Sequence, residues 1–211
     1  MIPFNKPYLT GQEVNRISEA HQLGQLSGDG HFTSLCSQWL ERNISSPCAL
    51  LTHSCTAALE MAAILIDIKP GDEIIMPSYT FVSSANAFVL RGGIPVFVDI
   101  RKDTLNIDEA LIEEAITSRT KAILPVHYAG VACEMDSILS IAKKHNLHVI
   151  EDSADTIGYR LNKKNLGKYS DITTNSMYAS HIITGAGFGG LVCFKDKKLY
   201  EKAKLLRGWG R

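Results

Sequence analysis

Short apolar runs alternate with longer helical patterns along almost the whole chain, and this alternation constrains the fold more than any other feature. The runs lie at residues 48–52, 73–77, 94–98, 121–126, 147–151, 172–176 and 190–194. Several are bounded by Gly or Pro, which is typical of strands covered on both faces. Strands that alternate with helices form mainly parallel sheets. We therefore predict an α/β fold with a mainly parallel seven-stranded sheet and helices on both faces.

The segments between the expected strands carry apolar side chains at helical spacing. Residues 56–67 are strong helix formers, and residues 135–142 and 196–207 have an apolar face. Asn106 is expected to cap a further helix, because its side chain can accept a hydrogen bond from a free backbone N–H. A helix near the N-terminus is expected to bury one stripe of side chains, formed by Phe32, Leu35, Cys36, Trp39 and Leu40.

Charge and cysteine content argue against several classes of protein. Lys and Arg total 22, as do Asp and Glu, so no net charge favours binding to nucleic acid or to an anionic membrane. The longest apolar stretch, residues 61–66, is too short to cross a bilayer, and the N-terminus does not resemble a signal peptide. The five cysteines form no CxxC pair, so no metal site is expected. These features predict a cytoplasmic protein.

Parallel sheets bind ligands beyond the carboxyl ends of their strands, so the residues that follow each strand are the candidate site. Small and hydroxylic residues at 52–56 follow the first strand and open a helix, an arrangement that binds phosphate but is also an ordinary helix cap. Phe81 follows the second strand. It is expected either to stack on a planar ring or to pack in the core.

Two acids, Glu151 and Asp152, end the fifth strand, and buried carboxylates need partners. No His or Cys follows closely enough to complete a metal site, so Asp152 is interpreted as a carboxylate that keeps a cofactor ring nitrogen protonated. His181 follows the sixth strand, where a structural or exposed histidine is the plainer interpretation. The Gly-rich segment 185–190 precedes a strand, which excludes a dinucleotide-binding loop.

Together these segments resemble the DegT/StrS-type sugar aminotransferase family, which depends on pyridoxal 5'-phosphate (PLP), has fold type I and includes nucleotide-sugar 3-dehydrases. The resemblance runs from Pro3 to Arg211. Four stretches resemble the transaminases that form dTDP-4-amino-4,6-dideoxygalactose: LSGDG (26–30), LTHSCTAALEMA (51–62), PGDEIIMPSYTFVSSANAFVLRGG (70–93) and PVHYAGVACEMD (125–136). The resemblance implies that residues 1–211 are a PLP-binding large domain, with an N-terminal arm and helices at about 1–46.

The resemblance also implies roles for individual residues. Cys55 and Thr56 would hold the cofactor phosphate with help from Ser176, and Phe81 would stack on the pyridine ring. Asp152 would pair with the pyridine nitrogen. Asp155 occupies the position where many members have a Gln that contacts the ring hydroxyl.

The largest departure from the family pattern is His181, which stands where the aminotransferases have their catalytic lysine. Histidine cannot form the covalent link to the cofactor that this lysine forms, but a neutral imidazole can move a proton near pH 7. The nucleotide-sugar 3-dehydrases have a histidine here, and the tail at 206–211 resembles theirs. Phe188 replaces a Glu that most members have, so the match to the dehydrases is incomplete.

The leading hypothesis is a 3-dehydrase that uses pyridoxamine 5'-phosphate (PMP) and acts on a nucleoside-diphosphate 4-keto-6-deoxyhexose in polysaccharide or lipopolysaccharide biosynthesis. His181 would remove a proton from the cofactor C4′ carbon, and the C3 hydroxyl would leave. One alternative is an aminotransferase with glutamate as donor, in which Lys163, Lys164 or Lys168 is a remote candidate for the missing amine. The other is a noncatalytic relative that binds cofactor or sugar nucleotide.

Members of this family are nearly twice as long and carry a small C-terminal domain. We therefore expect that domain to be absent here and the chain to be a fragment or a truncated frame, whose activity alone is an open question. The resemblance also implies a homodimer.

Overall fold

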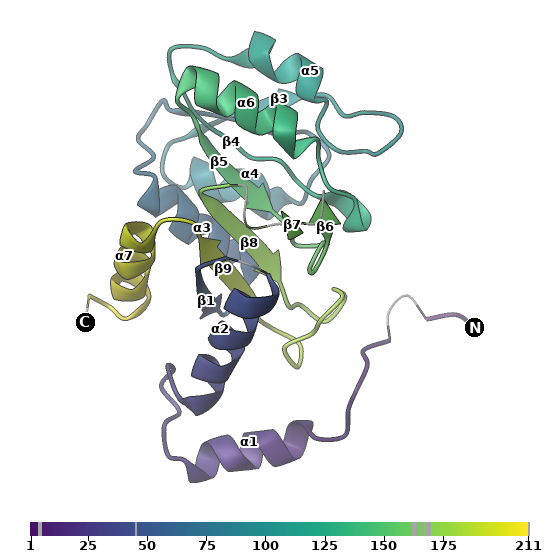
Figure 1. Ribbon diagram of the computed structural model, residues 1–211, viewed down its shortest axis with the longest axis vertical. Helices are drawn as coiled ribbons and strands as arrows, with labels where there is room; N and C mark the ends of the chain where they lie inside the picture. Colours follow the sequence, from purple (N-terminus) through teal and green to yellow (C-terminus); the bar gives the residue numbers. More distant parts are fainter. Residues whose placement is uncertain (4–5, 45, 162–163, 166, 168–169, 211) are drawn as a thin grey trace.

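One sheet organises the molecule. The computed structural model describes residues 1–3, 6–44, 46–161, 164–165, 167 and 170–210. Within these residues seven strands form a sheet in the order β1-β9-β8-β5-β4-β2-β3 (Figure 1). Their bounds are β1 Cys48–Thr52, β2 Glu73–Pro77, β3 Ile94–Val98, β4 Thr120–Ile123, β5 His148–Asp152, β8 Ile172–Ser176 and β9 Gly190–Phe194. Strand β9 is antiparallel to both of its neighbours and the other pairs are parallel, so the predicted mainly parallel sheet is confirmed.

Helices cover both faces of the sheet, as predicted. Alternate strand residues such as Ile74, Ile150 and Val192 pack in one core cluster with α3 (Cys55–Leu65), α4 (Val82–Val89) and α7 (Lys197–Arg207). Their neighbours Ile75 and Val149 face the other side, where they pack with α5 (Glu109–Ile112) and α6 (Met135–His145). The period of two along each strand thus separates the two cores. Two short 3-10 turns, Glu113–Ala115 and Tyr128–Gly130, and a small hairpin, β6 (Arg160–Leu161) with β7 (Lys164–Asn165), complete the described elements.

The two N-terminal helices are largely exposed, which for the second of them contradicts the prediction. Helix α1 (Glu13–Gln22) has no buried residue and lies apart from the sheet (Figure 1). Helix α2 (His31–Asn43) forms as expected, but Leu35 is 46% exposed and Trp39 is 52% exposed, so the predicted buried stripe is wrong. The physical reason is that α2 reaches the sheet only with its C-terminal end, where Leu40 packs against residues of β1 and β9.

The predicted cap at Asn106 is also wrong. Helix α5 begins at Glu109, and its cap is Asp108, whose carboxylate accepts a hydrogen bond from the Ala110 N–H. Asn106 is buried, and its amide instead bridges the Tyr128 N–H and the Val131 carbonyl at 2.9 and 3.0 Å. A buried amide is stabilised by using both its donor and its acceptor, and a long-range partner meets that need here.

A buried polar network fixes the end of β5 on the α6 side of the sheet. The His127 Nδ1 atom accepts a hydrogen bond from the Cys133 N–H, so its Nε2–H donates to Glu151 at 2.9 Å. Ser170 donates a second hydrogen bond to the same carboxylate. Burial alone would raise the pKa of Glu151, but the hydrogen bonds from His127 and Ser170 outweigh it and lower that pKa.

We expect Glu151→Ala to lower the free energy of unfolding by about 2–4 kcal/mol, because it leaves the buried Nε2–H of His127 without an acceptor and removes one of the acceptors of Ser170. Glu151→Gln keeps an acceptor and is expected to cost less. Urea unfolding at pH 7 measures both. Because the folded-state pKa of Glu151 is lowered, its ionised form stabilises the fold above the ordinary Glu value of about 4.3, and this contribution is lost as pH falls further. Equal stability of Glu151→Ala and the wild type would contradict the network's role.

Candidate active site

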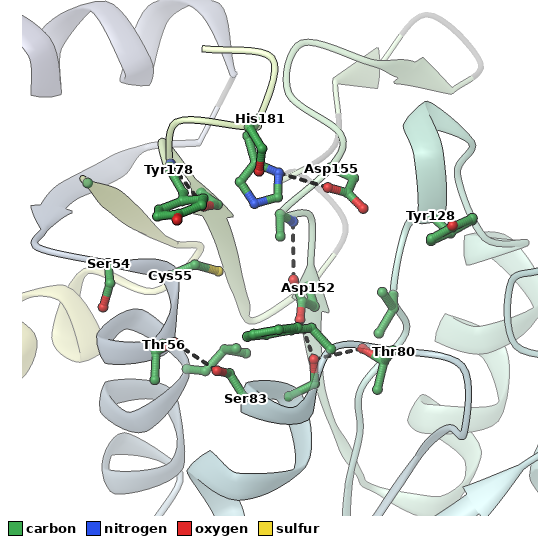
Figure 2. Close-up of a pocket in the computed structure, with 18 of the residues that line it drawn as sticks. Ser54, Cys55, Thr56, Thr80, Ser83, Tyr128, Asp152, Asp155, Tyr178 and His181 are labelled. Carbon is green, nitrogen blue, oxygen red and sulfur yellow. Dashed lines mark hydrogen bonds and ion pairs between the residues drawn. The ribbon is translucent and has the colours of Figure 1, made fainter. Parts of the chain in front are cut away.

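A cavity of about 580 Å³ lies at the edge of the sheet where the parallel strands end (Figure 2). Asp152 and Ser176 are the last residues of β5 and β8, and Cys55 begins the helix that follows β1. The cavity is lined by all of the residues that the sequence singles out: Cys55, Thr56, Phe81, Asp152, Asp155, Ser176 and His181. Segments up to 126 residues apart in the chain therefore meet in one place, as the strand-end rule expects.

The N-terminus of α3 forms one end of the cavity. The Ser54 hydroxyl accepts a hydrogen bond from the Ala57 N–H, and the Thr56 hydroxyl donates to Ser83 at 2.9 Å. A side chain at Gly190 would overlap the backbone of Ser54 and Cys55, so only glycine lets β9 approach the start of this helix. Hydroxyl groups around a helix N-terminus are suited to holding a phosphate.

The thiol of Cys55 is not in a reactive form. Burial, with a smaller contribution from the charge of Asp152, raises the pKa of the Cys55 thiol well above its ordinary value. The thiol therefore stays protonated at neutral pH and is a poor nucleophile.

Asp152 is the deepest charged group of the cavity and is only 4% exposed. Ser84 donates a hydrogen bond to Oδ2 at 2.7 Å, and the Ala154 N–H donates to Oδ1 at 3.1 Å. Burial raises the pKa of Asp152 in spite of these two hydrogen bonds. Among the described residues no ion pair neutralises it, so the site offers an ionisable carboxylate to a positively charged group of a ligand.

Phe81 lies at the start of α4 and is 74% exposed while lining the cavity. Its alternative role as a core residue is therefore wrong. The exposed ring is available for stacking on a planar ligand.

His181 and Asp155 meet above the cavity (Figure 2). The His181 Nδ1 atom lies 2.8 Å from Asp155 Oδ1, and the Tyr178 ring lies 6.4 Å from the imidazole, edge to face. His181 is thus neither buried in the core nor free at the surface: it is a cavity residue with an acidic partner. Lys163 and Lys168 lie outside the described residues, as does the side chain of Lys164.

The sequence did not point to several polar residues of this site. Ser84 donates a hydrogen bond to Asp152 and is itself hydrogen bonded to Thr80 at 2.7 Å. Elsewhere in the lining of the cavity, the hydroxyls of Tyr79 and Tyr128 are hydrogen bonded at 3.0 Å. The Ser83-Ser84 pair in the first turn of a largely apolar helix is the signal that would have identified Ser84 as a site residue. In the described part of the chain no helix is long and apolar enough to cross a membrane, and no cluster of three metal-ligating side chains is found.

Comparisons with known proteins agree with this geometry. Residues 7–211 match the DegT/DnrJ/EryC1/StrS aminotransferase family. GDP-perosamine synthase of Caulobacter vibrioides is 39% identical over 204 residues, which cover 97% of this chain and 55% of that protein. An aminotransferase from Psychrobacter cryohalolentis superposes with a TM-score of 0.91 at 33% identity, over 96% of this chain and 52% of that one.

A third relative, NtdA from Bacillus subtilis, was solved with bound cofactor PMP and superposes with a TM-score of 0.87 at 32% identity. The match covers 97% of this chain and 48% of that one. The chain therefore spans about half the length of the relatives it matches. These likenesses confirm the predicted fold of PLP-dependent aminotransferases.

We expect Asp152→Asn to raise the stability of the ligand-free chain at pH 8, because it removes a buried charge and keeps hydrogen-bonding atoms in place. Because the pKa of Asp152 is raised by folding, the folded chain holds the carboxyl proton more tightly than the unfolded chain does. Ionisation of Asp152 therefore lowers the stability of the fold as pH rises above about 3.9. Urea midpoints at pH 8 and pH 4 measure the effect, which should shrink at pH 4. Asp99→Asn, at an exposed acid, is the control. A lower midpoint for Asp152→Asn at pH 8 would contradict the expectation.

Proposed function

The chain belongs to the DegT/DnrJ/EryC1/StrS aminotransferase family, and from this premise we propose that it is the cofactor-binding part of a PLP- and PMP-dependent nucleotide-sugar 3-dehydrase. The proposed substrate is a nucleoside-diphosphate-linked 4-keto-6-deoxyhexose, which loses its C3 hydroxyl as water. The observation that carries the proposal is a histidine, His181, in the cavity of Asp152, at the position where the resemblance places the lysine of the aminotransferases.

The residues of the cavity fit the cofactor at three points. Asp152, buried and without an ion-pair partner among the described residues, would hold the protonated ring nitrogen. Phe81 would lie against the ring, and the N-terminus of α3 with Thr56 and Ser176 would hold the phosphate. When bound, PMP supplies an amine and an aromatic ring that accepts electrons.

His181 would act as the base that removes a proton at C4′. An imidazole can accept and return a proton near pH 7 without forming a covalent bond to the cofactor. A lysine at this position would instead hold the cofactor covalently between turnovers. The histidine therefore favours a reaction in which one group accepts the proton from C4′ and can return it to the departing C3 hydroxyl, which would leave as water.

The second candidate is an aminotransferase, because the Psychrobacter relative carries that name. In this case His181 would shuttle the proton between two carbons, and glutamate would supply the amine. The same cavity suits both reactions, which are distinguished by their products.

We further propose that the protein works as a cytoplasmic homodimer. Exposed apolar side chains support the association: Val14 and Ile17 on α1 are 73% and 64% exposed, and no residue of α1 is buried within the described chain. Contiguous exposed apolar groups of this kind are typical of association surfaces.

Incubation with PMP, glutamate and dTDP-4-keto-6-deoxyglucose, repeated with the GDP-linked analogue, tests the reaction by product mass. We expect a product that has lost the C3 oxygen. His181→Gln should abolish it, lowering the rate by about 10²–10⁴-fold while leaving PMP binding intact. A product in which the ketone has become an amine would overturn the dehydrase proposal in favour of the aminotransferase. PMP binding without either product would favour a noncatalytic relative.

A second prediction concerns the missing lysine. After incubation with PLP and borohydride reduction, the wild type should carry no cofactor mass on the peptide that contains position 181. The double variant His181→Lys/Asp155→Gln should carry it, since Asp155 would otherwise hold the new amine in its charged, unreactive form. Peptide mass mapping reads the result. Cofactor mass on Lys163, Lys164 or Lys168 of the wild type would show that another lysine replaces the missing one.

A further inference from the structure

The close contact between Asp155 and His181 joins two positions at which the resemblance marks a departure from the family pattern. We propose that Asp155 is a positioning residue, which keeps a proton on Nδ1 of His181 and so leaves Nε2 as the proton acceptor in the cavity. The catalytic role of His181 as a base rests on the proposed function. The arrangement of the two side chains is independent of it.

The distance between the two side chains bears on where the proton lies. Asp155 Oδ1 and His181 Nδ1 are 2.8 Å apart, and a carboxylate oxygen carries only lone pairs. A lone pair on Nδ1 at this distance would repel the carboxylate, so the contact favours the tautomer with the proton on Nδ1. In a neutral imidazole the other nitrogen, Nε2, then has the free lone pair. Figure 2 shows this second nitrogen on the side of the ring that faces away from Asp155, toward the cavity.

The backbone holds both side chains in place before any ligand binds. Strands β5 and β8 are adjacent and parallel, so the loops that follow them emerge side by side. The Asp155 loop is fixed by the Ala154 and Thr156 N–H groups, which donate to Asp152 and Ser153. Because the loops are tied to the ends of neighbouring strands, the pair is preorganised.

The His181 loop is tied in the same way. The Tyr178 N–H donates to the Ser176 hydroxyl, and the His181 N–H donates to the Tyr178 carbonyl. The imidazole therefore starts from a defined backbone position. Asp155 then fixes the rotation of the imidazole about its side-chain bonds.

The two acids of the cavity have different partners. Asp152 accepts its hydrogen bonds from Ser84 and Ala154, deeper in the cavity, whereas Asp155 is 41% exposed and contacts the imidazole. Tyr178 and Ser180, which also line the cavity beside the imidazole, are not acids that could take the place of Asp155. Asp155 is therefore the acid placed to select the tautomer of His181.

The family resemblance implies another role for Asp155, a contact with the ring hydroxyl of the cofactor. This role and the positioning of His181 have different measurable effects. A cofactor contact affects affinity for PMP, whereas a positioning residue affects the base. We expect Asp155→Ala to leave the Kd for PMP unchanged and to lower the rate of dehydration at saturating substrate by about 10²-fold.

The decisive experiment needs neither cofactor nor turnover. The chain labelled with ¹⁵N-histidine is examined at pH about 8.5, well above the ordinary histidine pKa of about 6.5, by two-bond ¹H–¹⁵N correlation spectra. The sequence has seven histidines, and the His181 signals are those missing from His181→Gln. We expect the proton of His181 on Nδ1 in the wild type and on Nε2 in Asp155→Ala.

Asp171→Ala is the matched control, because Asp171 lies 3.3 Å from Nδ1 of another histidine, His148. It should change the His148 signals and leave those of His181 as they are. A wild-type His181 with its proton on Nε2 would overturn the proposal, as would an Asp155→Ala variant that keeps the proton on Nδ1. If the tautomer changes as expected but the wild type dehydrates no sugar, the proposed function fails and the positioning role stands.

Discussion

The end of β5 places two adjacent carboxylates on opposite faces of the sheet, and the rest of the site depends on how each is satisfied. Glu151 points away from the cavity and is held by hydrogen bonds from His127 and Ser170. Asp152 points into the cavity and, within the described residues, has Ser84 and the Ala154 N–H as donors. Because neighbouring strand residues alternate in direction, the bonds of Glu151 hold the strand end from behind. The carboxylate of Asp152 is thereby kept at a defined depth.

This arrangement is costly to the ligand-free fold. A buried carboxylate with a raised pKa destabilises the chain at neutral pH, and the polar residues of the cavity do not neutralise it. Residues that lower stability in this way are typical of sites that bind a group of opposite charge. The same burial, together with the negative charge of Asp152, keeps Cys55 protonated. One acid thus makes the cavity selective for a cation and suppresses thiol chemistry beside it.

The sheet was predictable because its strands are buried on both faces, so each appears in the sequence as a continuous apolar run. All of the expected runs form strands at or near their predicted bounds, although the run 121–126 leaves regular pairing after Ile123. The predicted site residues converge because parallel strands end at one edge. The failures are of another kind. Apolar spacing in α2 does not say how much of the helix reaches the sheet, and the partners of Asn106 and Asp155 are distant in sequence.

The two departures at positions 155 and 181 are physically linked. An aminotransferase lysine must lose its proton to attack the cofactor, and a carboxylate at the distance seen here would stabilise its charged form instead. A neutral glutamine beside that lysine avoids this effect. A histidine gains from the carboxylate, because one nitrogen can keep its proton while the other remains basic. Asp155 is therefore compatible with a residue at position 181 that transfers protons, and unfavourable for a lysine that bonds covalently to the cofactor. The chemistry of the cavity thus depends on the pair of residues 155 and 181 rather than on a single substitution.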